Sequence, residues 1–126
     1  MNAPSPMRVL IVDDNDLASE LLSEFVGILG HEVSVAGDGA QALAKAAQEQ
    51  PDVIIVDIIL PDIDGYELAT RLRAQLGEKP MIMALSGLPK SMQRQQTDIF
   101  DSWLEKPVDL NVLEAILADA MNKRNL

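Results

Sequence analysis

Short apolar runs, rich in β-branched residues, alternate along the chain with longer segments in which apolar residues recur at helical spacing. Runs of the first kind predict strands, and segments of the second kind predict amphipathic helices. The five predicted strands cover residues 8–12, 32–36, 53–56, 81–85 and 102–105. Because strands and helices alternate, the pattern predicts an α/β fold built from repeated strand–helix units, with a parallel sheet covered by helices on both faces.

The intervening segments predict five helices, which cover residues 17–29, 40–50, about 66–76, part of 88–101, and 109–123. Asn15 or Asp16 can cap the first helix, and Gly30 ends it. The apolar residues of this helix recur at the spacing of an amphipathic stripe; they are Leu17, Leu21, Phe25, Ile28 and Leu29. In the last helix, the residues expected to face inward are Leu110, Leu113, Ile116, Leu117 and Met121. Residues 88–101 offer few apolar anchors, so any helix there is short and loosely held.

The composition narrows the class of protein. A chain of 126 residues falls within the usual span of one domain. Its formal net charge of −10 disfavours direct binding to DNA, RNA or anionic lipid, because these polyanions need a basic patch. The chain has no cysteine, its start lacks a signal-peptide pattern, and no apolar run approaches the length of a membrane helix. We therefore predict a cytoplasmic protein whose partner is neither a nucleic acid nor a membrane.

Chemically active side chains follow four of the predicted strands. Asp13 and Asp14 follow the first strand, Asp57 the third, Ser86 the fourth and Lys106 the fifth. Open parallel sheets place their ligand sites outside the carboxyl ends of the strands, so these groups should meet in one crevice. Two carboxylates at about 4 Å repel by about 4 kcal/mol at an effective dielectric of about 20, and a divalent cation would relieve that repulsion. The combination suits Mg²⁺ and a phosphoryl group.

The motifs Val12-Asp13-Asp14, Val56-Asp57 with Pro61 and Asp64-Gly65, Ser86-Gly87, and Lys106-Pro107 resemble, in their order along the chain, those of response-regulator receiver domains. The resemblance covers residues 7–123 and leaves residues 1–6 as a disordered N-terminal tail and 124–126 as a C-terminal tail. It implies a flavodoxin-like, doubly wound sheet of strand order 2-1-3-4-5 flanked by five helices. It also implies a signalling switch rather than a metabolic enzyme.

The same resemblance implies an acceptor and a metal site. Asp57 would accept a phosphoryl group from a histidine kinase or a histidine phosphotransfer protein, because a carboxylate can hold the group as a mixed anhydride. Asp14, Asp57 and the backbone carbonyl of Ile59 would ligate Mg²⁺ directly, and Asp13 would act mainly through water. Carboxylate and carbonyl oxygens are the hard ligands that Mg²⁺ prefers.

Three further residues take roles by the resemblance. Lys106 would pair with Asp57 and then with the phosphoryl oxygens, and its bond to Pro107 would be cis. Ser86 would donate a hydrogen bond to a phosphoryl oxygen. Trp103 occupies the place where receivers carry the switch aromatic, which is more often tyrosine, phenylalanine or histidine.

The chain departs from the receiver pattern near its signalling face. Receivers usually have Gly-Ala where this chain has Ile99-Phe100, and the stretch from Ser86 to Lys106 is somewhat shorter than usual. Ile59 and Leu88 fall where receivers place the side chains that flank the phosphoryl group, and neither apolar side chain can orient an attacking water. We therefore hypothesise a long-lived phosphoryl state.

Other interpretations stay open at the level of the sequence. Taken singly, Asp57 fits an acidic turn residue, Lys106 an exposed lysine on an edge strand, and Trp103 a core side chain. The main alternative function is a receiver-like module that binds a partner without phosphorylation. A Mg²⁺-dependent phosphohydrolase would use Asp14 and Asp16 as nucleophile and acid but leaves Asp57 unexplained. A flavodoxin would need a hydroxyl-rich phosphate loop after the first strand, and this chain lacks one.

Overall fold

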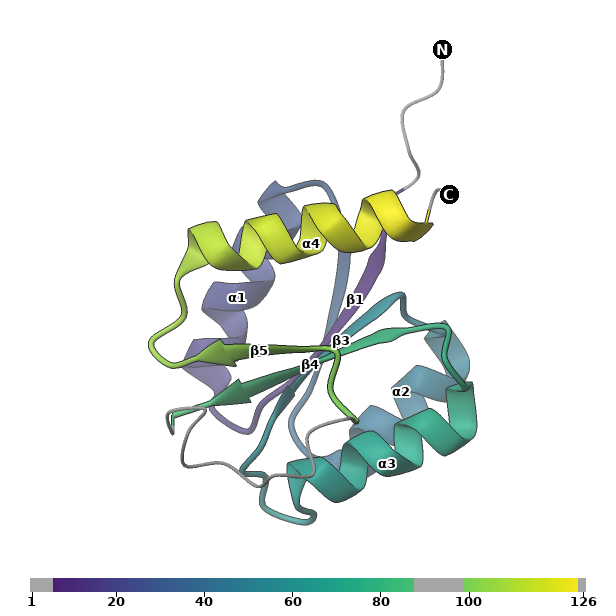
Figure 1. Cartoon of the computed structure of the whole chain (residues 1–126). Coiled ribbons are helices and arrows are strands. Elements are labelled where there is room, and N and C mark those ends of the chain that lie inside the picture. The colour runs from purple at the N-terminus through teal and green to yellow at the C-terminus, as the bar shows by residue number, and fades with distance from the viewer. Residues whose placement is uncertain (1–5, 88–98, 125–126) are drawn as a thin grey trace.

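A five-stranded parallel sheet forms the centre of the protein (Figure 1). The computed structural model describes residues 6–87 and 99–124. Its strands are β1 (Arg8–Val12), β2 (Glu32–Ala36), β3 (Val53–Asp57), β4 (Met81–Ser86) and β5 (Ser102–Glu105). They lie in the order β2-β1-β3-β4-β5, and each neighbouring pair is parallel. The predicted fold class and strand order are confirmed.

Helices cover both faces of the sheet. The described residues form four of them: α1 (Asp16–Ile28), α2 (Gly39–Glu49), α3 (Gly65–Leu76) and α4 (Leu110–Arg124). The predicted fifth helix falls mostly on residues 88–98, which lie outside the described residues. Figure 1 shows α1 and α4 on one face and α2 and α3 on the other. Among residues 6–87 and 99–124, no helix is both long enough and apolar enough to cross a bilayer.

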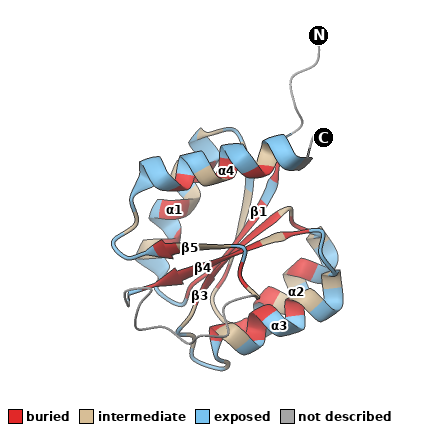
Figure 2. Ribbon diagram, viewed as in Figure 1, coloured by how far each residue is buried: buried red, intermediate tan, exposed pale blue. Residues whose placement is uncertain are grey.

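Side chains that alternate along the strands pack into two separate hydrophobic cores. Val9 and Ile11 of β1 pack in the cluster that contains α1 and α4, whereas Leu10 and Val12 pack in the cluster that contains α2 and α3. Successive side chains of a strand point to opposite faces, so a sheet covered twice needs continuously apolar strands. Every residue of β3 is buried (Figure 2), as the apolar run from Val53 to Val56 predicts for all but the final Asp57.

The face of α1 that points away from the sheet is partly apolar, whereas that face of a simple amphipathic helix is polar. Asn15 caps the helix by accepting the backbone N–H of Ala18 at 3.1 Å, as one of the two predicted caps. The helix buries Leu22 and Val26 against the sheet. Leu17, Leu21 and Ile28, however, are 69%, 60% and 83% exposed. The regular spacing of these three residues therefore marks an exposed stripe rather than the buried face.

The inward face of α4 is mostly as predicted. Leu113 and Leu117 are buried, and Ile116 and Met121 pack partly against the same core. The expectation for Leu110 is wrong, because this residue is 42% exposed. Leu110 is the first residue of the helix and precedes the turns that pack on the sheet through Leu113 and Leu117.

Candidate functional site

The carboxyl ends of the strands enclose one acidic pocket. Asp13 follows β1, Asp57 and Ser86 are the last residues of β3 and β4, and Lys106 follows β5. The pocket has a volume of about 320 Å³ and is lined by Asp13, Asp14, Asn15, Asp57, Ile58, Ile59, Ser86, Gly87 and Lys106. The structure therefore brings together all five of the side chains that the sequence placed in the crevice.

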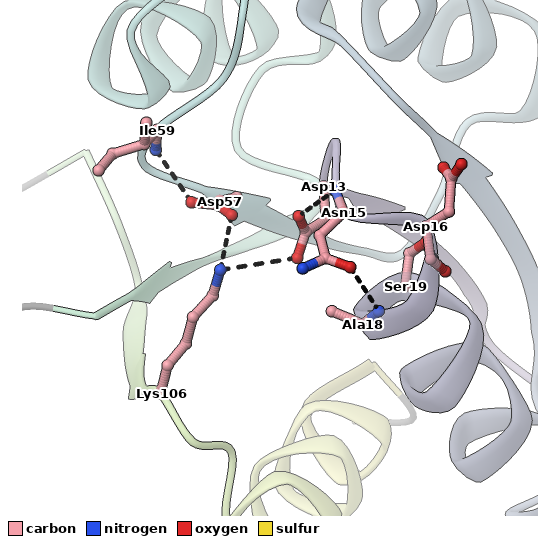
Figure 3. Close-up of polar contacts among 8 residues, drawn as sticks. All are labelled: Asp13, Asn15, Asp16, Ala18, Ser19, Asp57, Ile59 and Lys106. Carbon is pink, nitrogen blue, oxygen red and sulfur yellow. Dashed lines mark hydrogen bonds and ion pairs between the residues drawn. The ribbon is translucent and has the colours of Figure 1, made fainter.

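Both oxygens of the Asp57 carboxylate are held (Figure 3). Oδ2 accepts a hydrogen bond from Nζ of Lys106 at 2.7 Å, and Oδ1 accepts the backbone N–H of Ile59 at 2.9 Å. Asp57 is only 6% exposed. A buried carboxylate needs such partners to remain ionised, and it is the ionised form that acts as a nucleophile.

Asp13 is the most deeply buried acid of the pocket, with no exposed surface. Its Oδ1 accepts the N–H of Asn15 at 2.9 Å, but its Oδ2 has no hydrogen-bond donor and lies 3.7 Å from Nζ of Lys106. Burial raises the pKa of Asp13, and the charge of Asp57 raises it further, although Asn15 and Lys106 oppose both effects. An ionised, half-satisfied carboxylate is unfavourable here without a further cation.

The acidic residues fit a magnesium ion. Carboxylate oxygens of Asp13, Asp14 and Asp57 all lie within 4.8 Å of one another. The unpartnered Oδ2 of Asp13 supplies an oxygen that a cation would satisfy. Asp14 is exposed, so water has access to this side of the site. Magnesium usually keeps several of its waters and binds few protein ligands, which such a half-open acidic cluster allows.

Lys106 supplies the positive charge of the pocket. Burial by itself lowers the pKa of Lys106, but the hydrogen bond and the charge of Asp57 outweigh it, so that the pKa is raised. The side chain therefore stays an ammonium group. Its backbone N–H donates to the carbonyl of Ser86 at 2.8 Å, and its peptide bond to Pro107 is cis, as the receiver resemblance implied.

Ser86 and Trp103 lie on neighbouring strands, Ser86 on β4 and Trp103 on the edge strand β5. Ser86 ends β4, is 4% exposed and lines the pocket. Trp103 lies on β5 and does not line it. Its ring packs at 5.1 Å from Phe100 and 6.2 Å from Tyr66, measured between ring centroids. Phe100, one of the two residues that stand where receivers usually have Gly-Ala, is thus part of an aromatic cluster with Trp103.

Asp16 does not take part in the pocket. It is the first residue of α1, and Figure 3 shows its side chain directed away from Asp57 and Lys106. A phosphohydrolase that used Asp14 and Asp16 as a nucleophile and acid would need both at one phosphorus. The arrangement disfavours that alternative.

Gly65 has a positioning function that the sequence analysis treated only as part of a loop motif. A Cβ at Gly65 would lie 2.6 Å from Cα of Ile58 and 2.8 Å from the carbonyl oxygen of Asp57. The N–H of Gly65 donates to the carbonyl of Ile58 at 2.8 Å, while Asp64 caps α3 through the N–H of Tyr66. The loop after β3 thus folds back directly onto the end of β3, a close approach that requires glycine. The adjacent Asp64-Gly65 pair was the available signal.

Comparisons with known proteins establish the family. The model of the response regulator receiver domain matches residues 9–118, and the chain belongs to this family. Sensor histidine kinase RcsC of Salmonella typhimurium is 37% identical over 114 residues, which are 89% of this chain and 12% of that protein. Transcriptional regulatory protein TrcR of Mycobacterium tuberculosis is 36% identical over 121 residues, which are 94% of this chain and 47% of that protein.

The solved structures agree with this assignment. A CheY-like receiver domain from Methylobacillus flagellatus superposes with a TM-score of 0.85 at 32% identity, covering 92% of this chain and 99% of that one. The chain spans less than half the length of RcsC and TrcR, so the similarity concerns their receiver portions. The protein is a receiver domain homologous to those of sensor kinases and response regulators, a signalling switch of two-component systems. Its acidic pocket is typical of aspartate phosphoacceptors that use Mg²⁺.

Proposed function

We propose that this receiver domain accepts a phosphoryl group onto Asp57 from the phosphohistidine of a histidine kinase or a histidine phosphotransfer protein. The observation that carries the proposal is the 2.7 Å contact between Oδ2 of Asp57 and Nζ of Lys106, beside the buried Asp13. A nucleophilic carboxylate, a fixed ammonium group and acidic oxygens for a cation are the parts that phosphoryl transfer to an aspartate requires.

In the transfer, Oδ2 of Asp57 forms a bond to phosphorus as the phosphorus–nitrogen bond of the donor breaks. The donor imidazole leaves with a proton taken from solvent. Oδ1 stays with the N–H of Ile59, which orients the carboxylate for the attack. Lys106 moves its contact from Oδ2 to a phosphoryl oxygen and balances the charge that gathers there.

The proposed cation site uses the oxygens nearest to Asp57. Asp14 and Asp57 would hold Mg²⁺ directly, the backbone carbonyl of Ile59 would complete the protein ligands, and Asp13 would act mainly through water. The 4.8 Å grouping of the three carboxylates supports this set. When bound, the ion would neutralise charge on the phosphoryl oxygens.

Ser86 and Trp103 are the proposed readout of phosphorylation. The Ser86 hydroxyl, at the end of β4 in the pocket wall, would donate a hydrogen bond to a phosphoryl oxygen. This contact would draw in the strand end and change the surroundings of Trp103 on the neighbouring strand β5, since Ala84 pairs with Trp103 and Ser86 with Glu105. Trp103 would then report the state of the site through its packing with Phe100 and Tyr66.

Exposed apolar side chains support a protein as the phosphodonor. Leu17 and Leu21 lie on the first turns of α1, Ile59 on the loop after β3 and Leu110 at the start of α4, and their exposure ranges from 42% to 74%. All four belong to segments that leave the carboxyl ends of the strands, where the pocket opens. Apolar groups around a polar site are typical of a surface that docks another protein.

Treatment with a small phosphodonor and Mg²⁺ tests the proposal. We expect intact-protein mass spectrometry to record a gain of one phosphoryl group with acetyl phosphate and Mg²⁺, and we expect Asp57→Asn to abolish it. Asp16→Asn is the matched control, because Asp16 is a nearby acid directed away from the pocket, and it should label like the wild type. No gain in the wild type would favour the module that acts without phosphorylation, and a gain retained in Asp57→Asn would place the acceptor elsewhere.

The extent of the receiver unit as residues 7–123 and its cytoplasmic location stay predictions from the sequence. Expression of residues 7–123 alone, followed by thermal denaturation and phosphodonor labelling, tests the first. A folded, phosphorylatable product is the expected result.

A further inference from the structure

A single carboxylate ties the loop after the acceptor strand to a distant helix. Oδ1 of Asp62 accepts the backbone N–H of Gly39 at 2.9 Å, and its Oδ2 accepts the N–H of Ala40 at 3.1 Å. Gly39 and Ala40 are the first two residues of α2, and Asp62 lies in the loop between β3 and α3. The two bonds fix both the position and the orientation of the carboxylate, because they use both of its oxygens.

The helix does not need this contact for its own N-cap. Asp38 already caps α2 by accepting the N–H of Gln41 at 2.8 Å. The first N–H groups of a helix have no partners within the helix, and several can be satisfied at once. Asp62 takes two that the local cap leaves free, so its bonds join α2 to a different part of the fold.

The contact is also closely packed. Gly39 is buried, and a Cβ built on it would overlap Cγ2 of Ile63, the residue after Asp62. The backbone of α2 at Gly39 therefore packs directly against the Ile63 side chain of the loop. The loop is held on this side by two hydrogen bonds and by the packing of Ile63.

The other end of the same loop holds the acceptor. The N–H of Ile59 donates to Oδ1 of Asp57 at 2.9 Å, and Ile59 forms an antiparallel bridge with Asp64. Ile59 and Asp64 flank Asp62 on either side, so the loop is pinned at its base by the bridge and at its tip by Asp62. Movement of the tip would pass through only two residues before it reaches Ile59.

We propose that Asp62 is a positioning residue for phosphorylation, which acts by holding the loop so that the Ile59 N–H keeps the Asp57 carboxylate oriented. The proposal rests on the proposed role of Asp57 as acceptor. Loss of the Asp62 contacts leaves every pocket side chain present but frees the donor that fixes Oδ1. Orientation of a nucleophile contributes strongly to rate, and small displacements lower it.

Asp62→Ala and Asp38→Ala form a matched pair, because each removes one carboxylate from the start of α2 and only Asp62 contacts the acceptor loop. The first measurement is amide hydrogen exchange without Mg²⁺. We expect Asp62→Ala to speed exchange of the Ile59 N–H by about tenfold, and we expect Asp38→Ala to leave it close to the wild-type rate. This measurement needs no phosphodonor and no metal.

The second measurement is the rate of labelling by acetyl phosphate at saturating Mg²⁺. We expect Asp62→Ala to slow labelling by about tenfold at saturating donor and Asp38→Ala to keep the wild-type rate. Asp62→Asn keeps one acceptor oxygen, so it should hold one of the two N–H groups and restore part of both properties. Asp62→Asn also replaces Asp62→Ala as the test variant if Asp62→Ala does not fold.

The outcomes separate the two proposals. Equal Ile59 exchange in wild type and Asp62 variants, with only a lower melting temperature, would mean that Asp62 is a helix cap alone and would overturn this inference. Faster exchange with unchanged labelling would also overturn it, since the loosened loop would not matter for the chemistry. A wild-type protein that never labels contradicts the acceptor role of Asp57 and, with it, any positioning for phosphorylation.

Discussion

Nζ of Lys106 lies 2.7 Å from Oδ2 of Asp57, although the two residues are 49 positions apart in the chain. The contact exists because β3 and β5 are parallel, so their carboxyl ends lie at the same end of the sheet, with only β4 between them. Lys106 is also within 3.7 Å of Asp13, so one ammonium group compensates two buried carboxylates. The pocket without a cation therefore carries an excess of negative charge.

Lys106→Met should destabilise the Mg²⁺-free protein and slow phosphorylation severely. Removal of the ammonium leaves Asp13 and Asp57 without their counter-charge, which should lower the free energy of unfolding by about 1 kcal/mol, a figure kept low because the lysine side chain is about a third exposed. Urea denaturation measures the loss. Lys123→Met, which removes an exposed ion pair with Asp119, is the control and should change stability by less than about 0.5 kcal/mol.

Asp13→Asn should stabilise the Mg²⁺-free protein at neutral pH. A pKa that folding raises above its unfolded value favours the folded state at low pH, and this advantage is lost as pH rises through the folded value. Burial raises the pKa of Asp13 in this way. An ionised Asp13 therefore opposes folding at neutral pH, and the neutral asparagine should raise the free energy of unfolding by about 1 kcal/mol.

The same variant should lose most of the stabilisation that millimolar Mg²⁺ gives the wild type, since one of the three acidic oxygens would be gone. Melting temperatures with and without Mg²⁺ measure both effects. Asp16→Asn, outside the pocket, should keep the wild-type response. A wild-type melting temperature indifferent to Mg²⁺ would count against the metal site itself.

The sequence predicts the sheet well because its signal is local. A strand buried on both faces must be apolar along its length, and β3 satisfies this from Val53 to Val56, before its final residue Asp57. The buried face of α1 was harder, because apolar residues occur on two sides of the helix. The residues Leu22 and Val26 face the sheet, while Leu17, Leu21 and Ile28 face outward. Periodicity measures apolarity and does not distinguish a core from a surface that docks a partner.

The pocket was predictable and the Asp62 contact was not, for one physical reason. Residues at the ends of parallel strands must converge, so Asp13, Asp57 and Lys106 could be placed together from strand positions alone. Asp62 reaches the N-terminus of α2 across 23 residues of sequence by the path of a loop. No periodic pattern encodes a loop path, and an aspartate in a turn has an ordinary local explanation.

Asp62 should also make the stability depend on pH in acid. The N–H of Gly39, with that of Ala40, lowers the pKa of Asp62 despite an opposing effect of desolvation. A lowered pKa contributes stability that is present above the unfolded value and is lost as pH falls through the folded value. The difference in melting temperature between wild type and Asp62→Ala should therefore be constant above about pH 5 and shrink below about pH 4. A difference that does not change with pH would contradict an ionic contribution.

Gln50→Gly should stabilise the fold. Gln50 ends α2 with φ of 50° and ψ of 64°, the left-handed region, which favours glycine over residues with a Cβ. We expect a gain of about 0.5 kcal/mol, because relief of the steric cost is partly offset by the greater freedom of glycine in the unfolded chain. Gln48→Gly, two residues earlier and on the exposed side of the same helix, should instead lose about 1 kcal/mol. Chemical denaturation of the pair decides the sign.

Ile59→Asn should shorten the lifetime of the phosphorylated state. The Ile59 side chain is 74% exposed and lines the acidic pocket, while its contact with Asp57 is made by the backbone N–H and survives the substitution. An apolar side chain cannot hydrogen-bond a water that attacks phosphorus, whereas an asparagine amide can orient one. Its companion in the sequence prediction, Leu88, lies outside the described residues. We expect hydrolysis to speed up by about threefold to tenfold, measured as release of inorganic phosphate after the donor is removed.

Ile28→Asn is the control, since Ile28 is equally apolar and 83% exposed at the far end of α1. Equal half-lives in all three proteins would show that the apolar flank does not protect the aspartyl phosphate, and a wild-type half-life of seconds would remove the hypothesis of a long-lived state.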